Sequence, residues 1–376
     1  MAIKAFVGFE TGDAGEMESI GSGSSIQTGT VRSGAYAIKQ AGAKSFITTL
    51  ATATQQSYRA YFRFPTALPT ATSILFLTGQ NGGRRIWNLS LASSGKIILN
   101  STTTSGLTTV TGTTVLSADT WYNIGVAYAA SAGGAVNVSI DDVSEMATTH
   151  SNAATGAPNK LGLQGATTPN EYFFDDIRLD IDTLTIPVGA RIIARQGKAG
   201  APSDDAWTKN NATDANLCWS QTPFSTATNC SNAVNSAAQT MLVAAFSATQ
   251  TGHGTETVAT GDTINICKSA VVAKAALGST AHIRRYVIGV LSSATISLTT
   301  ADTYFEDGEF WNTSVTGLDS LEVGMAHAAD VNLEDCSDCW MMTDYSTSTS
   351  AAAAAAFFRK DIQFLGTRVG ARLGLG

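Results

Sequence analysis

Charged residues are scarce in this chain of 376 residues: Asp, Glu, Lys and Arg make up 14% of it, against 44% hydrophobic residues. Ser, Thr, Asn and Gly dominate the remainder, which is typical of rigid β-structure with uncharged polar surfaces and excludes the charge-rich composition of disordered chains. The net charge of −7 and the isoelectric point near 5.1 argue against a nucleic-acid partner, which would favour a basic surface.

Long apolar runs are also absent. No run approaches the roughly 18 apolar residues of a membrane-spanning helix, so we expect no membrane span. Residues 1–10 contain too short an apolar stretch for a secretory signal peptide, and Glu10 ends it. We therefore expect folding in a cytoplasm. Five cysteines, an odd number, argue against a disulfide framework.

Short strand patterns separated by turn signals fill the first half, and no useful helical periodicity occurs before residue 185. Residues 57–64 alternate strictly and end at Pro65, which predicts a strand with one face in a core. Its inward set is Tyr58, Ala60, Phe62 and Phe64, and its outward set is Arg59, Tyr61 and Arg63. We expect further strands at 73–78, 86–91, 96–100, 108–115, 121–128, 136–142 and 172–180, with a turn at 79–83.

The order of these segments resembles the concanavalin A-like jelly roll of lectins, laminin G modules and many phage virion proteins. The resemblance covers roughly residues 1–182 and rests on Phe9-Glu10-Thr11-Gly12, on 33–38, on the strand 57–64 and on Phe174-Asp175-Asp176-Ile177. It implies a two-sheet sandwich in which alternate side chains fill the core. The core candidates are Trp121, Ile124, Val126, Val136, Val138 and Ile140.

The chain beyond this region is again β-rich, with Gly and Pro residues that indicate a linker before it. We predict an all-β protein: a concanavalin A-like jelly roll over 1–186, a linker over 187–203, a second β-sandwich-like domain over 204–350, and an Ala-rich segment with a basic arm or closing strand over 351–376. The expected strands of the second domain are 239–247, 263–268, 286–291, 295–299 and 320–326. Residues 271–277 fit either a helix or a strand.

Four aspartates are candidate calcium ligands, because calcium takes six to eight oxygens and some members of the family hold one near the sandwich rim. They are Asp141, Asp142, Asp175 and Asp176. The alternative is that adjacent acids on a strand direct one side chain outward and the other into a local hydrogen bond.

Aromatic side chains are candidates for stacking on sugars, although an aromatic in a sandwich is more often a core or interface residue. The candidates are Tyr61, Trp87, Trp219 and Trp311. Glycoside hydrolysis needs two carboxylates about 5 to 9 Å apart. The chain lacks the Glu-x-Asp-x-Glu strand of related jelly-roll glycosidases, so we expect no enzyme activity, no catalytic residue and no cofactor.

The cysteines and the basic C-terminus leave alternatives open. Free, mostly buried thiols are the default expectation; the alternatives are a zinc site of Cys336-x-x-Cys339 with Cys218 and Cys230, and a Cys218–Cys230 disulfide formed after lysis, and no metal ligand is assigned. The tail is either a frayed closing strand or a basic arm that docks on an acidic neighbour. Its basic residues are Arg359, Lys360, Arg368 and Arg372.

The leading hypothesis is a non-enzymatic structural protein of a tailed-bacteriophage virion, in its tail, neck or head surface, made in the host bacterial cytoplasm. Its partners would be other virion proteins, copies of itself and a host-surface glycan. Low charge suits dense assembly, because crowded copies of high net charge repel one another. The alternative hypothesis is a carbohydrate-binding adhesin or lectin module, and the third is a glycan hydrolase.

Overall fold

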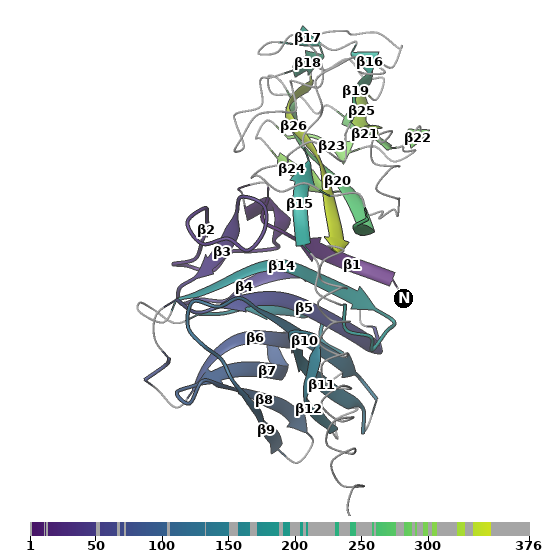
Figure 1. Ribbon diagram of the computed structural model, residues 1–376. Coiled ribbons are helices and arrows are strands. Elements are labelled where there is room, and N and C mark those ends of the chain that lie inside the picture. Colours follow the sequence, from purple (N-terminus) through teal and green to yellow (C-terminus); the bar gives the residue numbers. More distant parts are fainter. Residues whose placement is uncertain are drawn as a thin grey trace, which may run out of the picture.

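The computed structural model describes residues 2–187, except 11, 13, 50–52, 66–67, 71–72, 104–105, 132, 150–156 and 166–170. Beyond these it describes shorter segments: 191–195, 204–205, 208–209, 230–232, 241–245, 258, 261–275, 282–287, 290–291, 296–299, 303–306, 322–327 and 334–346. Within these residues the protein is all-β apart from a single 3-10 turn, η1 (Ala14–Glu16), and the sheets are antiparallel (Figure 1).

Two antiparallel sheets form a β-sandwich in the first half of the chain. Sheet A runs in the order β12 (Val143–Thr149), β11 (Ala135–Ile140), β10 (Tyr122–Ala129), β5 (Gln55–Arg63), β14 (Tyr172–Ile181), β3 (Ala37–Gln40) and β2 (Ser25–Gln27), with β1 (Ala2–Val7) also paired to β14. Sheet B runs β4 (Ser45–Thr49), β13 (Lys160–Leu163), β6 (Ser73–Asn81), β7 (Arg84–Ala92), β8 (Lys96–Thr103) and β9 (Gly106–Val115). The predicted all-β sandwich is confirmed.

One hydrophobic core lies between these sheets. Phe62 of β5 is at its centre: its ring stacks on Phe76 of β6 at 4.3 Å and contacts Tyr172 and Phe174 of β14 at 5.1 and 5.5 Å. The predicted alternation of β5 is confirmed, because Tyr58, Ala60, Phe62 and Phe64 are all core residues. Such alternation places every second side chain of a strand between the sheets.

The other core candidates are confirmed with one exception. Trp121 precedes β10 and is half-buried rather than part of the core, because the strand begins only at Tyr122. The turn predicted over 79–83 is shorter, since β6 continues to Asn81 and only Gly82 and Gly83 reverse the chain. Both glycines have positive φ values, 53° and 85°, which favour glycine.

Two further sheets follow in the second half. Sheet C runs β17 (Thr208–Lys209), β18 (Cys230–Asn232), β26 (Glu334–Ser346), β20 (Thr263–Ala275) and β24 (Thr303–Glu306), with β15 (Arg191–Arg195) also on β26. Sheet D runs β16 (Asp204–Asp205), β19 (Met241–Ala245), β25 (Glu322–His327), β21 (His282–Val287) and β22 (Val290–Leu291), with β23 (Ile296–Ser297) on β21. Residues 271–275 of the ambiguous segment are strand.

The predicted linker, 187–203, contains a strand. Residues 191–195 form β15 and pair along β26 from Arg191 opposite Tyr345 to Arg195 opposite Met341. The Gly and Pro signals of this region obscured a short strand whose partner lies far along the chain. The division into domains otherwise stays a prediction.

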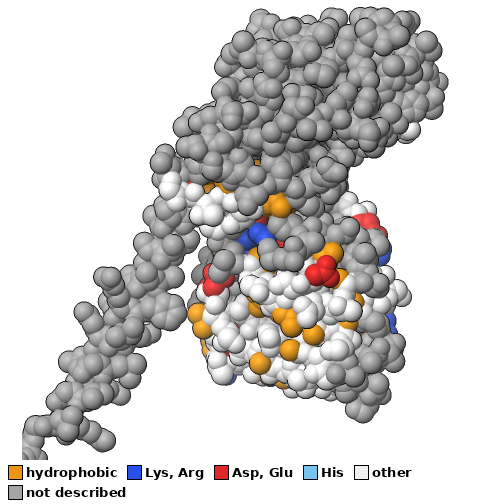
Figure 2. Space-filling model, turned by 90° about the vertical axis from the view of Figure 1, so that its right-hand side faces the viewer, with side chains coloured by type: hydrophobic (Ala, Val, Ile, Leu, Met, Phe, Trp, Pro, Cys, Tyr) orange, Lys and Arg blue, Asp and Glu red, His pale blue; other side chains and the backbone are white. Residues whose placement is uncertain are grey.

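Strands β15, β20 and β26 meet the sandwich at β1 and β14, on the outer face of sheet A (Figure 1). Lys268 of β20 donates from Nζ to the Phe6 carbonyl at 2.7 Å, and its Nζ lies 4.7 Å from the Phe6 ring centroid. On the face of the sandwich shown in Figure 2, uncharged polar surface predominates, and charged side chains are few. No helix within the described residues is long and apolar enough to cross a membrane.

Candidate functional site

Rows of side chains cross the outer face of sheet A from one edge to the other. The strand register places Ser139 of β11, Gly125 of β10, Arg59 of β5 and Arg178 of β14 side by side. β15 and β26 contribute residues that bond to the β5 and β14 end of these rows, whereas a pocket lies at the β10 and β11 end. We call the β10 and β11 end of this face the open half, and the β5 and β14 end the covered half.

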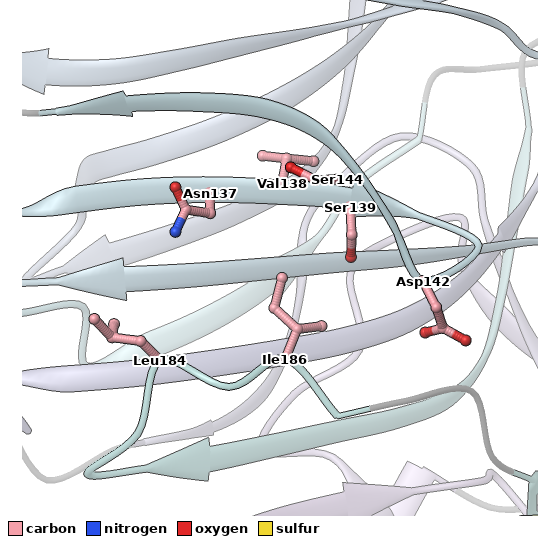
Figure 3. Close-up of a pocket in the computed structure, with 7 residues that line it drawn as sticks. All are labelled: Asn137, Val138, Ser139, Asp142, Ser144, Leu184 and Ile186. Carbon is pink, nitrogen blue, oxygen red and sulfur yellow. The ribbon is translucent and has the colours of Figure 1, made fainter. Parts of the chain in front are cut away.

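The pocket lies on the open half and has a volume of about 220 Å³. In Figure 3, Asn137 and Ser139 point from β11 toward the segment after β14 that carries Leu184 and Ile186. Asp142 from the β11–β12 turn and Ser144 from β12 complete the polar part of the lining, with Val138 behind them. The lining thus combines an amide, two hydroxyls and one carboxylate with an aliphatic wall.

Ser139 is the most distinctive member of this lining. Its side chain is 7% exposed, and its hydroxyl has no hydrogen-bond partner within the described part of the chain. A buried hydroxyl without a partner is costly, so natural proteins keep few of them. Ile186 packs beside it, directly over Gly125, where any Cβ would collide with both Ile186 and Ser139. Gly125 therefore makes room for the wall of the pocket.

The turn that carries Asp142 is a tight two-residue connection between β11 and β12. Asp141 and Asp142 both have positive φ, 50° and 65°, the conformation of a type I′ hairpin turn. Asp142 Oδ1 accepts a hydrogen bond from Asn123 Nδ2 at 2.7 Å, and Asp141 Oδ1 accepts one from the Asn123 N–H at 2.8 Å. These bonds hold the Asp142 carboxylate at the pocket rim. Burial raises the pKa of Asp141.

Asp175 and Asp176 lie on the covered half, and neither reaches solvent. Asp175 accepts hydrogen bonds from the backbone N–H groups of Arg32, Ser33 and Asp176 at 2.9, 3.3 and 2.8 Å. Asp176 lies at a register shift with φ of 47° and accepts from the Arg32 guanidinium, the Ser33 hydroxyl and the Ile192 N–H. The expectation that one carboxylate points outward is wrong, since a loop and β15 cover both.

Buried ion pairs connect the same half to β26. Asp344 Oδ2 lies 3.3 Å from Arg59 Nη2 and 3.3 Å from Arg178 Nη1, and Asn265 Nδ2 donates to its other oxygen at 2.9 Å. Arg178 also pairs with Asp180 through two bonds of 2.9 and 3.0 Å. Arg59 and Asp344 are fully buried, so these charges are stabilised by one another rather than by water.

Glu10 and Asp175 are buried carboxylates that accept only backbone hydrogen bonds among those described. Burial raises the pKa of Glu10 well above its ordinary value, and the nearby Asp175 raises it further. Burial also raises the pKa of Asp175, as does Asp176 beside it. Gly34, with φ of 62°, makes room for the Glu10 carboxylate, because a Cβ there would collide with it.

We expect the Glu10→Gln variant to lose part of the pH dependence of stability. An acid with a raised pKa in the folded state keeps its proton while the unfolded chain releases it, so stability falls as pH rises from the unfolded toward the folded pKa. Each pKa unit corresponds to about 1.4 kcal/mol, or a few degrees in Tm. Thermal unfolding at pH 4.5 and pH 7.5 should show a smaller decrease in Tm for the variant.

Glu145→Gln is the matched control, because Glu145 contributes to the pH dependence of stability in the opposite direction from Glu10. Hydrogen bonds from Thr113 and Thr114 outweigh partial burial and lower the pKa of Glu145. The stability from this group is present above the unfolded pKa and lost as pH falls through the folded one, so its removal should lower Tm at pH 7.5 more than at pH 4.5. If Tm decreased equally between pH 4.5 and pH 7.5 in wild type and in Glu10→Gln, Glu10 would not contribute to the pH dependence of stability.

The structure does not assemble the four predicted calcium ligands into one site. Asp141 and Asp142 bond to Asn123, while Asp175 and Asp176 bond to Arg32, Ser33 and Ile192. In the described portion of the chain, no three His, Cys, Asp or Glu side chains are grouped to hold a metal ion. Calcium binding at any of these positions stays a prediction.

Trp87 is not available to stack on a sugar, and this part of the prediction is wrong. It is fully buried in the core, with its ring 5.2 Å from Tyr58 in an edge-to-face contact. Tyr61 is 8% exposed, and the Arg32 guanidinium lies 3.4 Å from its ring centroid, so its outer face is occupied. Trp219, Trp311, Arg359, Lys360, Arg368 and Arg372 lie outside the described residues.

The pocket residues other than Asp142 were missed from the sequence. Asn137, Ser139 and Ser144 occupy the polar positions of ordinary alternating strands, and Ile186 is the last residue before the predicted linker, 187–203. The available signal was Gly125 inside a strand, which marks a close approach of other atoms. For the cysteines, Cys230 and Cys336 are opposite each other in the register of β18 and β26, and Cys218 lies outside the described residues.

The sequence matches no protein-family model and no curated protein. Among solved structures, the cellulose-induced protein Cip1 is 15% identical over 50% of this chain and 100% of that chain, with a TM-score of 0.39. Domain 4 of AbnA, a GH43 extracellular arabinanase from Geobacillus stearothermophilus in complex with arabinotriose, is 18% identical over 49% and 94%, with a TM-score of 0.36.

The ligand-binding domain of botulinum neurotoxin serotype D, in complex with N-acetylneuraminic acid, is 9% identical over 43% of this chain and 42% of that chain, with a TM-score of 0.35. TM-scores this low carry no argument about the ligand of this chain. The assignment to the all-β sandwich class rests on the chain's own sheets and core.

Proposed function

We propose that this protein is a non-enzymatic carbohydrate-binding β-sandwich protein whose ligand enters the pocket of Asn137, Ser139, Asp142, Ser144 and Ile186. The observation that carries the proposal is Ser139, a residue of the pocket lining whose buried hydroxyl has no hydrogen-bond partner in the described structure. A ligand hydroxyl would supply that partner, and binding would then recover the cost of burying the group.

The chemistry of the lining matches the two surfaces of a sugar. Amide, hydroxyl and carboxylate groups are the partners that ring hydroxyls need, and Leu184 and Ile186 offer an aliphatic wall to the C–H groups of a ring. Hydrolysis of the bound sugar would need a second carboxylate about 5 to 9.5 Å from the first. Asp142 is the single carboxylate in the described lining, which supports a binding role without catalysis.

We expect Ser139→Ala to weaken glycan binding by about tenfold or more without lowering stability, because it removes both a ligand contact and an unsatisfied buried hydroxyl. Binding would be measured first on a glycan array and then by titration calorimetry with the strongest oligosaccharide, and stability by thermal unfolding. Ser57→Ala is the matched control: Ser57 also has a buried hydroxyl without a described partner, on β5 and outside the pocket.

The paired result separates a binding role from a structural one. Loss of affinity in Ser139→Ala with wild-type affinity in Ser57→Ala supports the proposal. Equal affinities in wild type and Ser139→Ala would place the ligand elsewhere, and an array without any bound glycan would refute the proposed function.

The second candidate is a structural component of a tailed-bacteriophage virion. Its support is the junction of buried ion pairs, which ties β26 to β5 and β14 and suits a protein that holds two parts in one arrangement during assembly. A glycan pocket is compatible with such a role in host attachment. Mass spectrometry and immunogold labelling of purified particles test it, and absence of the protein from particles would exclude it.

A further inference from the structure

We infer that strand β9 is a self-association surface, through which two copies of this protein pair edge to edge as antiparallel strands. The inference is independent of the proposed function. It follows from the position of β9 at the end of sheet B, from its uncharged sequence, and from the opposite charges that lie at its two ends.

Strand β9 has a partner strand on one side only. It is the terminal strand of sheet B, and within the described residues it pairs with β8 alone. In Figure 1 it lies at the end of the sandwich remote from β15, β20 and β26, so these strands do not cover it. An antiparallel strand directs the N–H and C=O groups of every second residue away from its partner, and a further strand can bind these groups.

The sequence of β9 does not oppose such pairing. Natural edge strands are often blocked by charged side chains or by proline, and residues 106–115 contain neither. Leu107 and Val115 are 59% and 58% exposed, which makes them two of the three strongly exposed large hydrophobic residues in the described part of the chain. The third, Val143, begins β12, which lies beside β9. The exposed apolar side chains thus gather at this open edge.

The open part of the edge is a regular stretch of five residues, 107–111. They pair one to one with residues 98–102 of β8. Beyond this stretch the register shifts, and the Glu145 carboxylate from β12 accepts hydrogen bonds from the backbone N–H groups of Thr113 and Thr114. That carboxylate takes the place that a pairing strand would need, so the pairing of two copies must stop there.

The charges at the two ends of this stretch favour a second copy as the partner. Glu145 lies at one end. At the other end, Thr102 is opposite Leu107, and its hydroxyl donates to the Arg85 carbonyl at 2.8 Å. Arg84 and Arg85 are both exposed. Antiparallel pairing reverses one copy relative to the other, so the acidic end of each copy would face the basic end of its partner.

Pairing centred on Thr109 uses the whole stretch, because residues 107–111 are symmetric about it. Thr109 of one copy would then lie opposite Thr109 of the other, and such cross-strand threonine pairs stabilise sheets. The Thr109 hydroxyl donates to Asn100 Oδ1 at 2.9 Å, and Asn100 Nδ2 donates to Asn88 Oδ1 at 3.1 Å. This polar row of sheet B would continue into the second copy. Pairing of identical edges closes after two copies and leads to a dimer.

The test is analytical ultracentrifugation of the full chain over a range of concentrations. We expect a reversible monomer–dimer equilibrium with a dissociation constant of roughly 10 µM to 1 mM, because small interfaces are transient. Thr109→Lys and Thr109→Glu each place two like charges opposite each other, and each should weaken association by about tenfold or more. An equimolar mixture of the two variants places opposite charges across the dyad and should restore association.

Thr149→Lys is the matched control, since it adds the same charge at an exposed threonine of β12, the terminal strand of sheet A. It should associate like wild type, and thermal unfolding should show that all three variants remain folded. A wild-type chain that stays monomeric, a Thr109→Lys variant that associates as strongly as wild type, or a mixture no stronger than its components would overturn the inference. Loss of association in Thr149→Lys alone would assign the contact to β12 and overturn it as well.

Discussion

Replacement of Asp344 by Ala is expected to destabilise the protein by about 3 to 5 kcal/mol, the usual cost of leaving a buried charge without its partner. Asp344 lies 3.3 Å from both Arg59 Nη2 and Arg178 Nη1, and Arg59 is fully buried. Denaturant unfolding would measure the loss. Hydrogen exchange should be faster at the Ile192 N–H, which bonds to Asp176 in the same junction.

The double variant Arg59→Met with Asp344→Leu distinguishes charge from packing. It removes both members of the buried pair, while Arg178 keeps its two bonds to Asp180. Because apolar replacement of a whole buried pair is often neutral, most of the stability lost in Asp344→Ala should return. A double variant as unstable as Asp344→Ala would show that shape, and not unpaired charge, governs this junction.

Replacement of Phe62 by Ala is expected to cost about 3 to 5 kcal/mol as well, through a cavity at the centre of the sandwich. Four aromatic rings surround Phe62: Phe64, Phe76, Tyr172 and Phe174, with centroids 4.3 to 6.1 Å away. These neighbours come from β6, from β14 and from Phe64 just after β5, and they cannot all move inward together. Equilibrium denaturation followed by near-UV circular dichroism would report the loss of aromatic packing.

Phe62→Leu is the control for this prediction, since it keeps most of the apolar volume and should cost clearly less than Phe62→Ala. Phe62→Ala and Asp344→Ala should also accelerate hydrogen exchange in different parts of the structure. Phe62→Ala should accelerate hydrogen exchange in β5, β6 and β14, whereas Asp344→Ala should act first at β15 and β26. A Phe62→Ala variant with wild-type stability would contradict the placement of this residue in the core.

The alternating strands of the sandwich could be read from the sequence because each buries one face. Residues 57–64 show this most clearly: the inward set is the core set, and the outward side was also correct. What the pattern could not show is that Arg59 is fully buried on that outward side. Its partner Asp344 is 285 residues away, and local periodicity carries no information about such contacts.

The candidate site was harder to predict than the fold. Asp142 was named for calcium, yet its position in a β-turn at a pocket rim follows from a two-residue connection that was read as part of one strand. Trp87 was named for sugar stacking because an aromatic in an alternating strand fits either face. A register shift between β6 and β7 lies next to the Gly79–Trp87 pair. Simple alternation along β7 therefore does not show on which face of the sheet Trp87 lies.

The face of the sandwich that meets β20 and β26 is rich in ions: Arg59, Arg178, Asp180 and Asp176 lie on it. During synthesis, about 160 residues follow β14 before Asp344 is made, which takes roughly 8 to 30 s at about 5 to 20 residues per second. Throughout that interval water would solvate the charged side chains of this face, so the face would not present an apolar surface. The nascent sandwich can therefore wait for its partner strands without offering neighbouring chains an apolar surface on which to aggregate.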